Sequence, residues 1–156
     1  MSTSTQPGLG RAMVPAIINA VINGTAAYSV HRDRASVPLT VDAISSTEAT
    51  VGSEAAMIAL TLAVVLTSIT ALVARKGQSG QGAGNRTRPF FPTVPLIALQ
   101  NALMLFGATV AAAVLWQRAA GTVKVSPLTA ALLVAVFAGV ATVVIHVRTT
   151  AAMSQT

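Results

Sequence analysis

The chain has 156 residues, of which 53% are hydrophobic and only 9% are charged, and its mean hydropathy is +0.70. About a quarter of the residues of a soluble domain are charged, so this composition excludes an ordinary soluble fold. Cysteine is absent, which excludes disulfides, thiolate nucleophiles and cysteine metal sites. The net charge of +6 does not indicate nucleic-acid binding, because the basic residues flank hydrophobic blocks and few aromatic residues accompany them.

Four apolar blocks are long enough to cross a hydrocarbon core of roughly 30 Å, which takes about 20 helical residues. They cover residues 12–30, 55–74, 93–116 and 128–147, and none of them contains Asp, Glu, Lys or Arg. The sequence therefore predicts an all-α integral membrane bundle of four transmembrane helices, in a single domain over residues 1–156.

The first block contains two amides, Asn19 and Asn23, one helical turn apart and so on one helix face. Small residues lie beside them at Ala16, Ala20 and Gly24, and such residues let two helices approach closely. We interpret the amides as contacts between helices, and a polar lining for a small solute is the alternative. Their expected partners are Gln100 and Asn101, at comparable depth in the third block. Although residues 24–26 resemble a signal-peptidase site, only one arginine precedes the block, so we expect a retained helix.

The segment that follows, residues 31–54, is expected to be a partner-docking loop on the outer side of the membrane. It contains all four acidic residues of the protein, Asp33, Asp42, Glu48 and Glu54. Ser45 and Glu48 have capping-box spacing, which predicts that the second helix begins outside the membrane. His31 and His146 are expected to be solvated at opposite membrane boundaries, so no metal site is predicted.

The third and fourth blocks contain further small residues, and the loops set the orientation. Gly107 with Ala111, and Ala131 with Ala135 and Gly139, predict close-packing faces suited to a bundle or a dimer.

One side of the membrane would hold six basic residues and the other four, which places both termini in the cytoplasm. The membrane-interface anchors are expected to be Tyr28 and Trp116 on the outer side, and Arg75, Lys76, Arg86 and Arg88 on the inner side.

A weak internal repeat relates the two halves of the chain. "SVPLT" at 36–40 follows the first block, and "VSPLT" at 125–129 follows the third. Tyr28 and Trp116 occupy matching places, as do Pro15 and Pro95. Duplication of a helical hairpin is one interpretation, and chance clustering in a biased composition is the other.

The tyrosine near the end of the first block, the "VPLT" after it, the serine-rich approach to the second block and the "ARKG" at its exit form a pattern. It resembles a loose group of small bacterial four-helix membrane proteins of uncharacterised function. The resemblance covers roughly the first half of the chain, and it implies a bacterial cytoplasmic (inner) membrane and a compact bundle. No activity and no cofactor can be carried over from this group to the chain.

The sequence lacks the features of dedicated catalytic machinery, because serines have no nucleophile elbow and no paired carboxylates are placed for a pocket. Charged residues inside spans mark ion and proton pathways, and these spans have none. We therefore expect a non-catalytic accessory, assembly or regulatory subunit in contact with the lipid bilayer and with another membrane protein or a second copy. The alternative is a passive small-solute pore that works as an oligomer.

Overall fold

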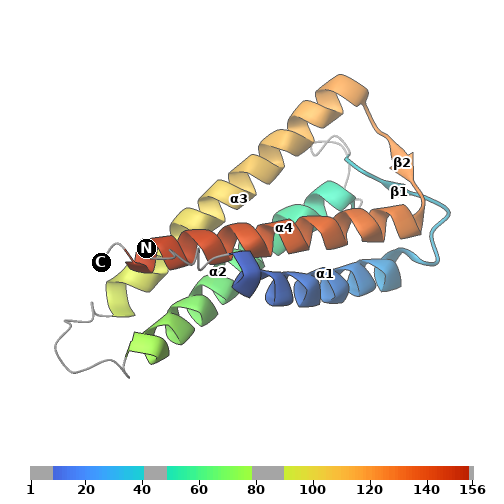
Figure 1. The fold of residues 1–156 in the computed structure, drawn as a ribbon. Coiled ribbons are helices and arrows are strands. Elements are labelled where there is room, and N and C mark those ends of the chain that lie inside the picture. The colour runs from blue at the N-terminus through green and yellow to red at the C-terminus, as the bar shows by residue number, and fades with distance from the viewer. Residues whose placement is uncertain (1–8, 41–48, 79–89, 155–156) are drawn as a thin grey trace, which may run out of the picture.

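The computed structural model describes residues 9–40, 49–78 and 90–154. These form four helices: α1 (Leu9–His31), α2 (Val51–Gln78), α3 (Phe90–Ala120) and α4 (Pro127–Ser154). All four are long and apolar enough to cross a membrane, and they contain the four blocks expected from the sequence. Two short strands, β1 (Val37–Pro38) and β2 (Lys124–Val125), pair antiparallel between the loops that follow α1 and α3 (Figure 1).

The starts of α2 and α4 are fixed by side-chain caps. Thr50 Oγ1 accepts a hydrogen bond from the Ser53 amide at 3.0 Å, and Ser53 Oγ accepts one from the Thr50 amide at 3.0 Å. Ser126 Oγ accepts a bond from the Thr129 amide at 3.1 Å, and Pro127 occupies the first position of α4, where its missing N–H breaks no bond. The capping box predicted at Ser45 and Glu48 lies outside the described residues.

The helices pack as a row rather than around a common centre. α1 packs along α4, α4 along α2, and α2 along α3, whereas α3 has few contacts with α4. Figure 1 shows α3 diverging from α4 toward its C-terminal end. The spatial order is therefore α1–α4–α2–α3, in which the two end helices each have one main neighbour.

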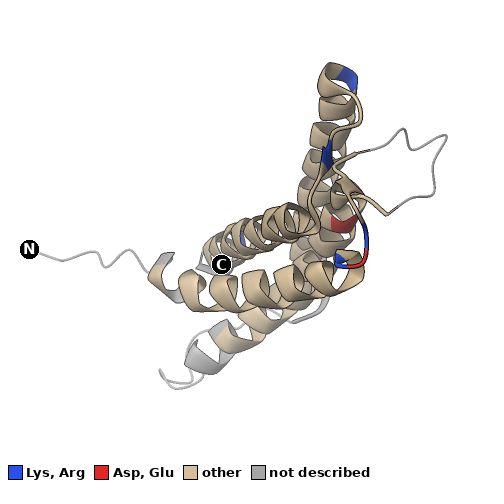
Figure 2. Ribbon diagram, turned by 90° about the vertical axis from the view of Figure 1, so that its right-hand side faces the viewer, with Lys and Arg blue, Asp and Glu red and all other residues tan. Residues whose placement is uncertain are grey.

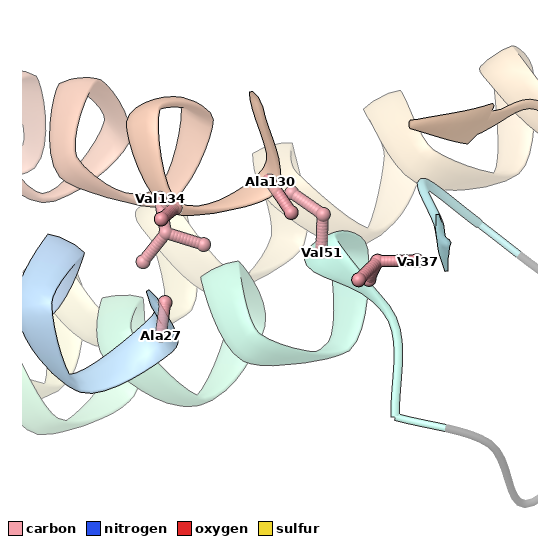
Figure 3. Packing of buried hydrophobic residues seen from close by; sticks show 6 residues of the cluster. Ala27, Val37, Val51, Ala130 and Val134 are labelled. Atoms are coloured by element: carbon pink, nitrogen blue, oxygen red, sulfur yellow. The ribbon is translucent and has the colours of Figure 1, made fainter. Parts of the chain in front are cut away.

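The interior of this row is built largely from small side chains. One buried cluster joins β1 and the first turns of α2 and α4 to α1 (Figure 3), and it consists of Ala27, Val37, Val51, Ala130, Ala131 and Val134. A second cluster lies further along the helices and consists of Leu62, Ala63, Ala102, Ala138, Ala141 and Ile145. Large apolar side chains instead face outward; Val14, Leu115 and Val136 are 64%, 69% and 64% exposed. This distribution is the reverse of that in a soluble protein.

Most of the described charged side chains gather where α1 and α3 end and α2 and α4 begin (Figure 2). We call this region, residues 31–40, 49–54 and 117–127, the strand end, because β1 and β2 lie there. It contains Arg32, Asp33, Arg34, Glu54, Arg118 and Lys124. Arg148 lies near the opposite end of α4.

Candidate functional site

The interface between α1 and α4 brings together two stripes of small residues. Gly24 lies against α4 so closely that an added Cβ would be 2.8 Å from Ala135 Cβ and 3.4 Å from the Ala131 carbonyl oxygen. On the other helix, a Cβ on Gly139 would lie 3.5 Å from Ala20 Cβ. The stripe expected in residues 16–24 therefore packs directly on the stripe expected in residues 131–139.

Asn19 adds a hydrogen bond to this interface. Its Nδ2 donates to Thr142 Oγ1 at 3.2 Å, and that hydroxyl donates to the Ala138 carbonyl oxygen at 2.7 Å. Asn23 behaves differently, because its Nδ2 donates to the carbonyl oxygen of Asn19 in the same helix at 2.8 Å. Of the two amides, Asn19 joins two helices and Asn23 satisfies its donor within α1.

Asn101 forms the second polar junction, between α2, α3 and α4. Its side chain is 1% exposed, and its Nδ2 donates to Thr67 Oγ1 at 3.1 Å and to Thr149 Oγ1 at 3.2 Å. Arg148 Nε donates to Asn101 Oδ1 at 3.2 Å. Both ends of the buried amide are thereby bonded, which removes most of the cost of burying it.

The expected pairing of Asn19 and Asn23 with Gln100 and Asn101 is not formed. α1 and α3 lie at opposite ends of the row, so their amides cannot meet within one chain. Gln100, although adjacent to Asn101, is exposed, and it makes no side-chain hydrogen bond within the described part of the chain.

The partners of the amides are threonines that sequence reasoning missed. Thr142 and Thr149 are seven residues apart on α4, and both are buried along with Ala138 and Ile145. The sequence did contain a signal for these partners, because two hydroxyls spaced seven residues apart in an apolar helix share one helix face.

His31 is fully buried, so the prediction that it is a solvated interfacial residue was wrong. Its Nε2 lies 2.7 Å from Glu54 Oε1, because the first turn of α2 is placed against the end of α1. The two atoms are at ion-pair distance but are not aligned as a hydrogen bond. His31 Nδ1 and Glu54 Oε2 are also buried, and neither has a hydrogen-bond partner among the described residues.

The expected docking loop is correspondingly smaller than the sequence indicated. Glu54 turns toward His31 and contributes to the contact between α1 and α2 rather than to a free surface. Asp33 is 89% exposed and lies 3.6 Å from Arg32 Nε, whereas Asp42 and Glu48 lie outside the described residues. Asp33 is thus the one expected docking carboxylate that the described residues place on the surface.

Side chains missed by the sequence reasoning hold the strand end together. Thr40 Oγ1 donates to Gln117 Oε1 at 2.6 Å, and Gln117 Nε2 donates to Thr122 Oγ1 at 3.1 Å. The Gly52 amide donates to the Leu39 carbonyl oxygen at 2.8 Å. A Cβ on Gly52 would lie 3.2 Å from that oxygen, which favours glycine at the contact between α2 and the β1 segment.

The remaining expected site residues fall at the ends of the helices. Tyr28 and Trp116 are 46% and 48% exposed near the C-terminal ends of α1 and α3, at the strand end. Arg75 and Lys76 lie in the last turns of α2, while Arg86 and Arg88 lie outside the described residues. The described residues contain no group of three or more His, Cys, Asp or Glu side chains placed to hold a metal ion.

The comparisons with known proteins add no relative to this description. No protein family, no curated protein and no solved structure matches the chain.

Proposed function

We propose that the protein is a non-catalytic membrane subunit that acts through contacts of its helices and its strand end with other membrane proteins. The observation that carries this proposal is that polar side chains within the apolar helices form hydrogen bonds to other helices of the same chain. Asn19 and Asn101 are bonded to threonines of neighbouring helices, in two junctions that meet α4 seven residues apart, at Thr142 and Thr149. These contacts support a role in packing, because each amide is bonded to a side chain of another helix of the same chain.

Insertion in a bilayer is supported by the distribution of side-chain sizes. Alanine, threonine and asparagine are buried between the helices, while leucine, valine and isoleucine cover the outside. In lipid, helices associate through close packing and interhelical hydrogen bonds rather than through burial of large apolar side chains. Four helices of sufficient length and apolar character are therefore proposed to cross the membrane.

The proposed location is the cytoplasmic (inner) membrane of a bacterium, with both termini in the cytoplasm. The first residues of α1 and the last residues of α4 lie on the same side of the helices, away from the strand end (Figure 1). The larger number of lysines and arginines in the segments on that side of the helices favours a cytoplasmic location for it. The aromatic rings of Tyr28 and Trp116 then lie at the outer interface.

Duplication of a helical hairpin is also proposed. α1 packs on α4 as α3 packs on α2, while α2 and α4 pack on each other. This pattern is what an approximate two-fold relation between the hairpins α1–α2 and α3–α4 requires. The antiparallel pairing of Val37 with Val125 and of Pro38 with Lys124 brings together the two segments of similar sequence that suggested the repeat.

The competing function is a passive pore formed by an oligomer and lined by polar residues. Asn19 and Asn23 are half-buried at the α1–α4 interface, and one of them is bonded across it, which argues against a role as a lining. A pore predicts that solute flux into vesicles changes when Asn19 or Asn23 is replaced by leucine.

The experiment that tests the proposed function is native mass spectrometry of the full chain, extracted gently from its own membrane. A stoichiometric second protein is the expected result. A homo-oligomer with no other chain, together with a solute flux that changes in Asn19→Leu vesicles, would contradict the subunit function and support the pore.

A further inference from the structure

Gln100, on the outward face of α3, makes no side-chain hydrogen bond within the described residues. Gln100 is exposed, while its neighbours Asn101 and Ala102 are 1% and 7% exposed and face α2 and α4. By contrast, the hydroxyls of Thr61, Ser68 and Thr109 each donate to the carbonyl oxygen four residues earlier. Gln100 has no such bond within the described residues.

The apolar residues around Gln100 follow a coiled-coil spacing. Exposed residues recur at alternating intervals of four and three along α3, opposite the face that packs on α2, and they are Leu96, Gln100, Leu103, Gly107, Val110 and Val114. We call these six residues the α3 seam. Residues spaced in this way keep one stripe of a helix turned toward a partner helix over many turns.

Gly107 lies in the middle of the α3 seam with open space in front of it. A Cβ added there would meet no atom of the chain within 4 Å, in contrast to Gly24, whose Cβ would clash with α4. A glycine at the centre of a helix face allows a second helix to approach closely. Within one chain, no helix among the described residues packs against Gly107.

We propose that a second copy of this chain covers the α3 seam, forming a parallel two-fold dimer in which the two Gln100 amides bond to each other. Copies of one protein insert in the same direction, so a symmetric contact has its axis along the membrane normal and equivalent residues meet at equal depth. A carboxamide supplies both a donor and an acceptor, so two copies of Gln100 satisfy each other without a further group. A polar residue at one seam position also fixes the register of the two helices.

This inference rests on the proposed function, because it identifies a second copy as one of the partners contacted within the membrane. Lipid chains alone match the apolar residues of the α3 seam but offer no partner to the Gln100 amide, which lies seven residues, or about 10 Å, inside Thr93. A different membrane protein would have to present a matching amide or hydroxyl at that depth. The second copy has one by symmetry.

Oxidative cross-linking of single-cysteine variants tests the dimer, since the natural chain contains no cysteine. We would introduce Leu103→Cys, Gly107→Cys or Val110→Cys into the full chain, in vesicles of phosphatidylethanolamine and phosphatidylglycerol. Each should form a disulfide-linked dimer at least about tenfold faster than its control, because a disulfide needs Cα atoms within about 7 Å. The matched controls are Ala108→Cys, on the same helix beside the seam, and Val136→Cys, which is exposed on α4.

A second measurement tests the role of the amide. In the Gly107→Cys background, Gln100→Leu should weaken dimerisation about 3- to 30-fold, as measured by the lipid dilution at which cross-linking falls by half. Leu115→Ala, an exposed change away from the seam, should leave that dilution unchanged.

The outcomes separate this inference from the proposed function. Equal cross-linking at Gly107→Cys and Ala108→Cys, or unchanged dimerisation in Gln100→Leu, would overturn the dimer. If cross-linking within the native membrane links Gly107→Cys to a different protein, the second copy is excluded while the subunit function stands. The third outcome combines two results: the chain dimerises through the α3 seam, and its Asn19→Leu variant alters solute flux. This outcome would uphold the dimer and contradict the subunit function.

Discussion

Gly24 and Gly107 occupy similar sequence surroundings but opposite structural ones. Each lies in a stripe of small residues on an apolar helix, yet Gly24 is pressed against Ala135 while Gly107 meets no atom within 4 Å. The α1–α4 interface is closed within the chain, whereas the outward face of α3 is open. A stripe of small residues therefore indicates that a close approach is possible, and the surrounding packing decides whether the chain itself makes it.

The largest expected effect comes from filling the closed interface. Gly24→Leu should destabilise the monomer by about 3 kcal/mol, because even a Cβ would lie 2.8 Å from Ala135 Cβ and the two helices would have to separate. The free energy of unfolding can be followed by titrating the protein from a mild detergent into dodecyl sulfate and recording the fluorescence of Trp116, the single tryptophan.

Gly107→Leu is the matched control for this change. Its side chain enters open space, so the free energy of unfolding of the monomer should change by less than about 0.5 kcal/mol. Equal destabilisation by the two leucines would contradict the distinction between the closed and the open face.

The adjacent amides of α3 give the next comparison. Asn101→Leu removes the bonds to Thr67, Thr149 and Arg148 and should destabilise the protein by about 2 kcal/mol. Gln100→Leu, one residue away, removes an exposed amide that makes no hydrogen bond within the described residues, and it should leave the stability of the monomer unchanged. A larger loss in Gln100→Leu than in Asn101→Leu, measured by the same titration, would show that the two faces are assigned the wrong way round.

The pair formed by His31 and Glu54 at the strand end should show a smaller effect. Glu54→Leu leaves His31 buried with no acidic partner and should cost about 1 kcal/mol, since the two groups are close but poorly aligned. Asp33→Asn serves as the control, because that carboxylate is 89% exposed and its contact with Arg32 is solvated. The same unfolding titration at constant pH measures both, and equal stability of the two variants would argue against a structural role for the pair.

The smallest effect is expected at the α1 amides. Asn19→Leu removes the bond to Thr142 and should destabilise the protein by about 0.6 kcal/mol, the average for a hydrogen bond between membrane helices. Asn23→Leu removes only a bond within α1 and should change stability less. If Asn23→Leu has the larger effect, Asn23 makes an interhelical contact that the structure assigns to Asn19.

Much of the fold follows from the sequence because it depends on local properties. The length and apolar character of the four blocks predict α1 to α4, and the four-residue spacing at Ala16, Ala20 and Gly24 predicts a close-packing face. The choice of partner does not follow. Pairing of α1 with α4 rather than with α3 depends on matching two whole surfaces, and the amides Asn19, Asn101 and Gln100 look alike in sequence.

The site at the strand end was harder to predict for a related reason. His31 follows the apolar part of α1 and is followed by Arg32 and Asp33, a context typical of a solvated residue. Its burial depends on a long-range contact, with Glu54 of α2 lying against the end of α1. Contacts of this kind leave no periodic trace in the sequence.

The row order also constrains how the protein can be made. Of the four helices, α1 is translated before the others and α4 after them, yet the two are main neighbours, and β1 likewise pairs with β2 from the other half of the chain. The small-residue face of α1 therefore stays uncovered until α4 has been translated. During that interval Asn19 has no Thr142 to bond, so the first helix of the fold completes its interhelical contacts only when the last one arrives.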